Sequence, residues 1–259
     1  MKQLIYILFL WSGSIYAQEA IEVTPLKKIP FAAEKLIGID NFGTVYYSDN
    51  RSLYKQTDQE TLNYSNIQLG NITSANTFNN LKINLFYKNF NTVVILDNRL
   101  AEVFKIDFNT QNLYKNVALV STGYDNTIWV FNQDMQQLEL FDYKTLKTRA
   151  VTMPVDSQAL SIVSNYNFCW LLTEKSLYIY NYFGSLVAKL PNNGFTEMSE
   201  SNGHIVLKKD QTLTYLAKDS EIFVPIQLPE LLIKQFLVTN ETLYIYDQEN
   251  LHQFQLKIE

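Results

Sequence analysis

Short apolar segments separated by polar turns recur along almost the whole chain. The clearest example is 126–154, where 127–131 is apolar and β-branched, 138–143 alternates apolar with polar positions, and 148–153 ends at Pro154. Alternation with a period of two and β-branched or aromatic content are typical of half-buried strands. This stretch therefore predicts three consecutive short strands.

The same pattern repeats about every 40 residues. One marker is an apolar residue followed by proline, which suits the end or the edge of a strand. This marker occurs at Pro30, Pro154, Pro191 and Pro229. A second marker is an apolar strand inside each unit, which begins at Thr44, Thr92, Thr127, Phe168, His204 and Thr242. Four-stranded units of this length are typical of a β-propeller.

The repeats predict an all-β fold, a six-bladed β-propeller with four-stranded antiparallel blades. The last unit, 231–259, has only three strands, whereas 20–30 resembles the fourth strands of the other units. We expect this N-terminal strand to pair with the last blade and close the ring, because an open ring would leave two exposed edges. In the second unit, 71–82 is a longer polar entry, either a loop over one face or a tolerated insertion. No helix of any length is expected.

The first 17 residues have the pattern of a signal peptide. Lys2 supplies a positive start, 4–11 is apolar, and Ala17 offers a small residue before Gln18. The apolar run is shorter than the roughly 20 residues that cross a bilayer, so cleavage is favoured over an uncleaved anchor. We therefore expect a signal peptide at 1–17 and a single domain at 18–259, exported to the periplasm, the outer membrane or the medium of a Gram-negative cell.

Charge and cysteine content reduce the number of possible functions. The net charge is −5 and no Lys/Arg-rich run is present, so nucleic-acid binding is not expected. The only cysteine, Cys169, has apolar neighbours, and a buried structural thiol is favoured over a reactive nucleophile. No cofactor is expected.

In repeat length and strand order, the six units resemble six-bladed β-propellers of the NHL and YncE-like type, which include exported bacterial proteins. The resemblance covers nearly all of 18–259, and no unit carries a WD dipeptide or a kelch double glycine. Such folds serve as scaffolds, ligand binders and a few enzymes, so the resemblance implies architecture rather than function.

The connections between second and third strands are the candidate binding surface, because they share one face with the connections between blades. Two of them carry the same Asp-Asn-Arg sequence. The candidate residues are Asp49, Arg51, Asp97, Arg99 and Asp247. In one interpretation they form a charged patch, since arginine grips carboxylate or phosphate with two hydrogen bonds. In the other, Asp and Asn merely satisfy the backbone angles of tight turns.

Catalytic patterns are sparse. The two histidines, His204 and His252, are far apart in sequence and do not form a zinc motif. Glu197 is a candidate channel carboxylate, which a calcium-dependent lactonase would need in greater number. Paired aromatics such as Tyr178 and Tyr180 are either stacking surfaces for sugar or peptide, or core. The sequence thus favours a non-catalytic module or scaffold that binds a protein or an envelope component, with a propeller hydrolase or lactonase as the alternative.

Overall fold

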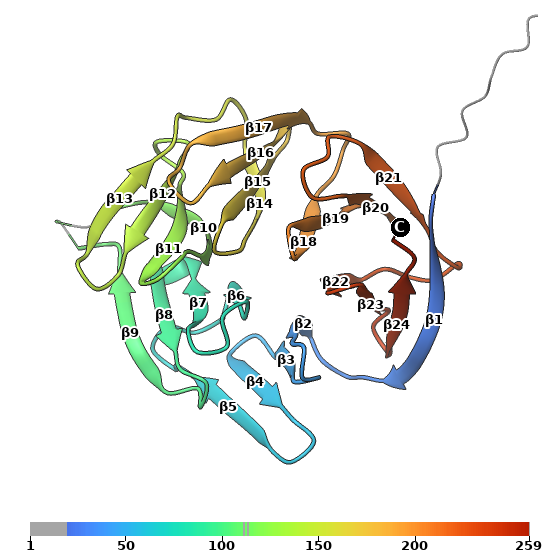
Figure 1. Cartoon of the computed structure of the whole chain (residues 1–259). Coiled ribbons are helices and arrows are strands. Elements are labelled where there is room, and N and C mark those ends of the chain that lie inside the picture. The colour runs from blue at the N-terminus through green and yellow to red at the C-terminus, as the bar shows by residue number, and fades with distance from the viewer. Residues whose placement is uncertain (1–19, 111, 113, 259) are drawn as a thin grey trace, which may run out of the picture.

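The computed structural model describes residues 20–110, 112 and 114–258. The predicted signal peptide at 1–17 lies outside the described residues. Sheets are arranged in a ring, with an edge strand toward the middle and the other strands farther out, and the largest sheet has both of its edge strands toward the middle (Figure 1). No described helix is long and apolar enough to cross a membrane.

Four of the sheets are separate and four-stranded. The first contains β2 (Lys35–Ile39), β3 (Val45–Ser48), β4 (Ser52–Gln56) and β5 (Thr61–Ser65). The second contains β6 (Ser74–Asn76), β7 (Ile83–Tyr87), β8 (Thr92–Leu96) and β9 (Glu102–Asp107). The third contains β10 (Val117–Thr122), β11 (Thr127–Asn132), β12 (Gln137–Asp142) and β13 (Lys147–Val151). The fourth contains β14 (Ala159–Ser164), β15 (Phe168–Thr173), β16 (Ser176–Asn181) and β17 (Leu186–Pro191).

The remaining strands form one eight-stranded sheet in the order β18-β19-β20-β21-β1-β24-β23-β22. Its first part comprises β18 (Glu197–Ser201), β19 (His204–Lys209), β20 (Thr212–Leu216) and β21 (Phe223–Gln227). Its second part comprises β22 (Gln235–Thr239), β23 (Thr242–Tyr246), β24 (Asn250–Leu256) and β1 (Ile21–Pro30). The N-terminal strand pairs antiparallel with β24, as the sequence predicted.

The expectation of six separate four-stranded units needs a correction here. The structure has four separate sheets and one larger sheet, because β1 pairs with two strands. The first two residues of β1 form a short parallel ladder with β21, through Ile21↔Ile226 and Glu22↔Gln227. The rest of β1 forms the antiparallel ladder with β24. This parallel ladder joins the outer strands of the last two units.

The second unit also differs from the prediction. Its innermost strand is β6, which lies inside the polar stretch 71–82, where the sequence pattern predicts an entry loop or an insertion. The strand that begins at Thr92 is therefore the third of its sheet rather than the second. The reason is that Ser74, Ala75 and Asn76 show no apolar alternation. One 3₁₀ turn, Lys88–Phe90, is present between β7 and β8, where no helical turn was expected.

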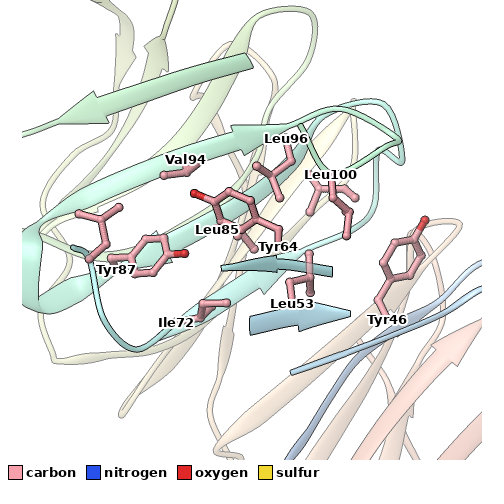
Figure 2. Close-up of a cluster of buried hydrophobic side chains, with 11 residues drawn as sticks. Tyr46, Leu53, Tyr64, Ile72, Leu85, Tyr87, Val94, Leu96 and Leu100 are labelled. Atoms are coloured by element: carbon pink, nitrogen blue, oxygen red, sulfur yellow. The ribbon is translucent and has the colours of Figure 1, made fainter. Parts of the chain in front are cut away.

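The hydrophobic core lies between neighbouring sheets. Figure 2 shows one such cluster, in which Leu53 of the first sheet and Leu85 of the second are fully buried. Tyr46 and Tyr87 belong to the same cluster, and burial raises the pKa of each phenol to about 12. Side-by-side packing of this kind makes each sheet depend on its neighbours for burial.

The antiparallel order gives the ring two distinct faces. The connection from the innermost to the second strand of each sheet lies at one face, which we call the AB face. It comprises the segments 40–44, 77–82, 123–126, 165–167, 202–203 and 240–241. The connection from the second to the third strand lies at the opposite end, the BC face. It comprises the segments 49–51, 88–91, 133–136, 174–175, 210–211 and 247–249.

Candidate functional site

The innermost strands surround a channel with a volume of about 580 Å³. Its wall includes residues of β2, β6, β10, β14, β18 and β22, together with four of the AB connections. A cavity of this size falls in the range of small-molecule sites. The channel is therefore large enough for a small molecule, and its two ends differ in chemistry.

Opposite charges meet at the BC end of the channel. Glu197 opens β18, and its Oε1 accepts a hydrogen bond of 3.0 Å from Lys208 Nζ. Lys35 opens β2, and burial lowers the pKa of its ammonium, although the charge of Glu197 opposes that shift. Lys35 Nζ also donates to the carbonyl oxygen of Thr73. These groups are partnered within the protein, so this end offers little unpaired charge.

Two carboxylates lie at the AB end. Asp40 follows β2, and its Oδ1 accepts from the backbone N–H groups of Phe42 and Thr44, while Oδ2 accepts from Asn80. Glu200 lies on β18, and its Oε1 accepts from the Gly203 N–H and from Asn165 Nδ2. Burial raises the pKa of Glu200, and these two hydrogen bonds only partly oppose the rise.

A chain of asparagine amides connects three neighbouring AB connections. Asn202 Nδ2 donates to Asn240 Oδ1 at 3.1 Å, and Asn240 Nδ2 donates to Asn41 Oδ1 at 3.1 Å. Asn202 and Asn240 have positive φ angles, which asparagine tolerates better than most residues. The amides therefore connect the two halves of the eight-stranded sheet and join that sheet to the first one, and each keeps further donors or acceptors.

Aromatic side chains lie exposed on the same face. Phe42 is 92% exposed on the connection after β2. Phe78 and Tyr166 come from the second and fourth sheets and contact edge to face, with 4.9 Å between ring centroids. On the fourth sheet's outer connection, Tyr182 and Phe183 are also exposed. Exposed rings beside amides and carboxylates are typical of binding surfaces.

The residues predicted from the repeated Asp-Asn-Arg sequence do not come together. Asp49 and Arg51 lie between β3 and β4, on the BC face, and Asp247 lies on the same face between β23 and β24. Asp97 and Arg99 lie between the third and fourth strands of their sheet, which is the end where the AB face lies. The two Asp-Asn-Arg turns are therefore at opposite ends of their sheets.

All three predicted aspartates hold their own turns. Asp49 Oδ1 accepts from the Ser52 N–H, and Asp97 Oδ1 accepts from the N–H groups of Arg99 and Ala101. Asp247 accepts from its turn and from His252 Nε2 at 2.7 Å. Burial would raise the pKa of Asp247, but the His252 and backbone hydrogen bonds outweigh it and hold that pKa well below the usual range.

The remaining candidates for chemistry are partnered or buried. Cys169 is fully buried, and burial raises the pKa of its thiol well above the usual value. His204 Nδ1 accepts from the Lys218 N–H and contacts the Tyr215 hydroxyl at 2.6 Å. Within the described part of the chain, no three His, Cys, Asp or Glu side chains are grouped to hold a metal ion.

The aromatic pairs in the sequence are Tyr46 with Tyr47, Phe86 with Tyr87, Tyr178 with Tyr180, and Tyr244 with Tyr246. Their interpretation as core is confirmed for most of these rings, which are buried. The buried members are Tyr46, Phe86, Tyr87, Tyr178, Tyr180 and Tyr246. The exposed rings that sequence reasoning missed lie instead in the AB connections. A signal was present, since these connections carry an aromatic residue in each of the first four units, at Phe42, Phe78, Tyr124 and Tyr166.

No protein-family model matches the chain, and no curated protein is similar to it in sequence. Solved structures do resemble it. Virginiamycin B lyase from Staphylococcus aureus has a TM-score of 0.60 at 12% identity, covering 85% of this chain and 79% of that one. BamB from Moraxella catarrhalis has 0.51 at 14%, covering 85% and 69%. The WD40 domain of Neurospora crassa Pan2 has 0.59 at 8%, covering 88% and 76%.

At these identities the likeness shows the fold alone. Together with the ring of antiparallel four-stranded sheets, it defines a β-propeller architecture.

Proposed function

We propose that this chain is an exported, six-bladed β-propeller that binds a protein or another component of the cell envelope without acting on it chemically. In this proposal the eight-stranded sheet consists of two blades. One blade is β18–β21, the other is β22–β24 with β1, and their outer strands β21 and β1 pair with each other. Both parts repeat the inner-to-outer strand order of the four separate sheets, which supports counting them separately.

The observation that carries the binding role is the composition of the AB face. Exposed aromatic rings, Phe42 above all, lie beside a channel mouth lined by asparagine amides. Rigid aromatic rings give contact area at low entropic cost, and amides give adaptable hydrogen bonds, which together favour recognition. Export rests on the pattern of residues 1–17, and the periplasm or outer membrane is the proposed location.

The proposal is tested by placing a photo-crosslinking phenylalanine analogue at position 42 or at position 90. Phe42 lies on the AB face, whereas Phe90 is an exposed ring on the BC face and serves as the matched control. Irradiation in envelope extract should give a reproducible adduct from position 42 and none from position 90. Adducts from neither position, with the folded protein present, would remove the support for a binding module.

A hydrolase centred in the channel is the second candidate. One observation favours it, namely that Glu200 is a carboxyl in a cavity with a pKa raised by burial, as general acids often have. The test is hydrolysis of an aromatic lactone such as dihydrocoumarin, with and without Ca²⁺. Turnover that is lost in Glu200→Gln would replace the binding role with catalysis. Absence of turnover in the wild type and in Glu200→Gln would rule out the hydrolase function.

A further inference from the structure

A second hollow adjoins the mouth of the channel on the AB face. It has a volume of about 280 Å³ and is lined by Asn202, His204, Asn240, Glu241, Thr242, Gln255 and Ile258. Asn202 and Asn240 also line the channel, so the two hollows share a rim. A ligand that fills both must therefore be longer than a single compact group.

The second hollow and the rim it shares with the channel present hydrogen-bond donors and acceptors. The Lys218 N–H donates to His204 Nδ1, so the neutral imidazole carries its hydrogen on Nε2 and offers a donor. Glu241 Oε2 accepts from Gln255 Nε2 at 3.1 Å, and the remaining oxygen of that carboxylate is an additional acceptor. With the amides of Asn202 and Asn240, the lining therefore contains both donors and acceptors.

Hydroxyl groups fit this mixture of donors and acceptors better than groups that only donate or only accept. A hydroxyl donates one hydrogen bond and accepts others, so neighbouring hydroxyls of a sugar can engage an amide or a carboxylate from both sides. Sugar rings also carry an apolar face of C–H groups, which requires an exposed aromatic partner. Phe42 provides such a ring, because it is 92% exposed and lies in the connection that lines the channel mouth.

The charge at this rim selects among sugars. Asp40, Glu200 and Glu241 contribute three carboxylates to the linings of the two hollows at this face. Lys35, the one cation in the described linings, opens β2 at the opposite end of the channel. An anionic polysaccharide would therefore meet like charge, which is an effective way to exclude a competitor.

We infer that the AB face holds a neutral oligosaccharide, one part in the channel mouth beside Phe42 and the next in the hollow beside His204. The inference rests on the proposed binding function and assigns its ligand class. A protein segment is the competing occupant, and the polar lining of two adjoining hollows beside one exposed ring favours the sugar, whose hydroxyls and C–H face match these two features.

The first test is a glycan array probed with labelled protein comprising residues 18–259. It is followed by calorimetric titration with chitotetraose, maltotetraose and cellotetraose, and with tetragalacturonic acid as the anionic probe. At least one neutral tetrasaccharide should bind, and the anionic probe should bind at least tenfold more weakly. An array on which no neutral glycan is bound, or on which acidic glycans bind best, overturns the inference.

Variants locate the site. Phe42→Ala should weaken the bound tetrasaccharide by roughly tenfold, since it removes the exposed ring. Asn240→Asp should weaken it by a similar factor, because a donor is replaced by a carboxylate while the turn geometry is kept. Phe90→Ala, at the BC face, should leave the affinity within twofold. Equal losses in Phe42→Ala and Phe90→Ala would contradict the assignment of the face.

The crosslinking experiment separates the two proposals. If no neutral glycan binds but position 42 still gives a protein adduct, the binding function holds and the sugar is wrong. If neither glycan nor adduct is found, both proposals fail.

Discussion

Two aspartates on the BC face and two asparagines on the AB face use their side chains in different ways. On the BC face, Asp49 and Asp247 accept hydrogen bonds from the backbone of their own turns. On the AB face, Asn202 bonds to Asn240 between the two halves of the eight-stranded sheet, Asn240 bonds to Asn41 of the first sheet, and the exposed ring of Phe42 follows Asn41. A charged or polar residue in a turn is therefore weak evidence for binding, because the turn itself accounts for it. Amides that reach between sheets beside exposed aromatics are stronger evidence.

The largest expected effect on stability is that of a substitution at Asp247. Asp247→Ala removes acceptors for two backbone N–H groups and for His252. We expect a loss of about 1 to 2 kcal/mol of unfolding free energy at pH 7, by urea denaturation. Phe42→Ala, on the AB face, should change stability by less than about 0.5 kcal/mol. Equal effects of the two variants would contradict the distinction between the faces.

The pH dependence of the Asp247 effect has a definite sign. Its pKa is lowered on folding, so its contribution is complete above the unfolded value of about 4 and is lost as the pH falls below it. The difference in melting temperature between wild type and Asp247→Ala should therefore shrink between pH 6 and pH 2.5. A difference that stays constant over this range would show that ionisation is not involved.

The amide chain on the AB face gives the next largest effect. Asn240→Asp removes the donor to Asn41 while keeping an acceptor for Asn202. A loss of about 1 kcal/mol is expected, typical of one hydrogen bond in a partly buried position. Asn71→Asp, at an exposed position between the first and second sheets, is the control and should be within about 0.5 kcal/mol of wild type. If both variants behave alike, the amides do not link the sheets energetically.

Glu200 should respond to pH in the direction opposite to Asp247. Its pKa is raised on folding, so the ionised carboxylate opposes folding at pH values above the unfolded value of about 4.3. Glu200→Gln keeps an acceptor for Gly203 and Asn165 and removes the charge. The variant should melt above wild type at pH 8, and the gain should vanish near pH 4. A gain of equal size at both pH values would point to packing instead.

The smallest expected effects are those of the two arginines. Arg51 and Arg99 are exposed and lie at opposite ends of their sheets, so neither Arg51→Glu nor Arg99→Glu should alter stability by more than about 0.5 kcal/mol. If one surface binds a partner through charge, only one of the two variants should reduce its capture. Equal losses in both single variants would mean that the partner spans both faces.

Most of the fold could be predicted from alternation and repeat length, because each strand with one buried face has to alternate. β6 could not be predicted in this way, because Ser74, Ala75 and Asn76 have no apolar alternation and form a strand through pairing with β7. That single omission moved Asp97 and Arg99 to the wrong connection. The site was harder to predict, because whether an aromatic residue is exposed depends on which sheets meet. Tyr46 and Phe42 lie four residues apart, and one is fully buried while the other is almost fully exposed.

The pairing of β1 has a consequence for the order of folding. β1 is synthesised before every other strand of the ring, yet Lys28 pairs with His252 of β24, the last of these strands in chain order. Contacts so distant in sequence form slowly, because closing the long loop between them costs chain entropy. Their free energy offsets that cost only when most of the chain is already ordered. Closure should therefore be the final and rate-limiting event. Until it occurs, β24 remains an unpaired edge, which makes the period just after synthesis the time at which this protein most needs protection from aggregation.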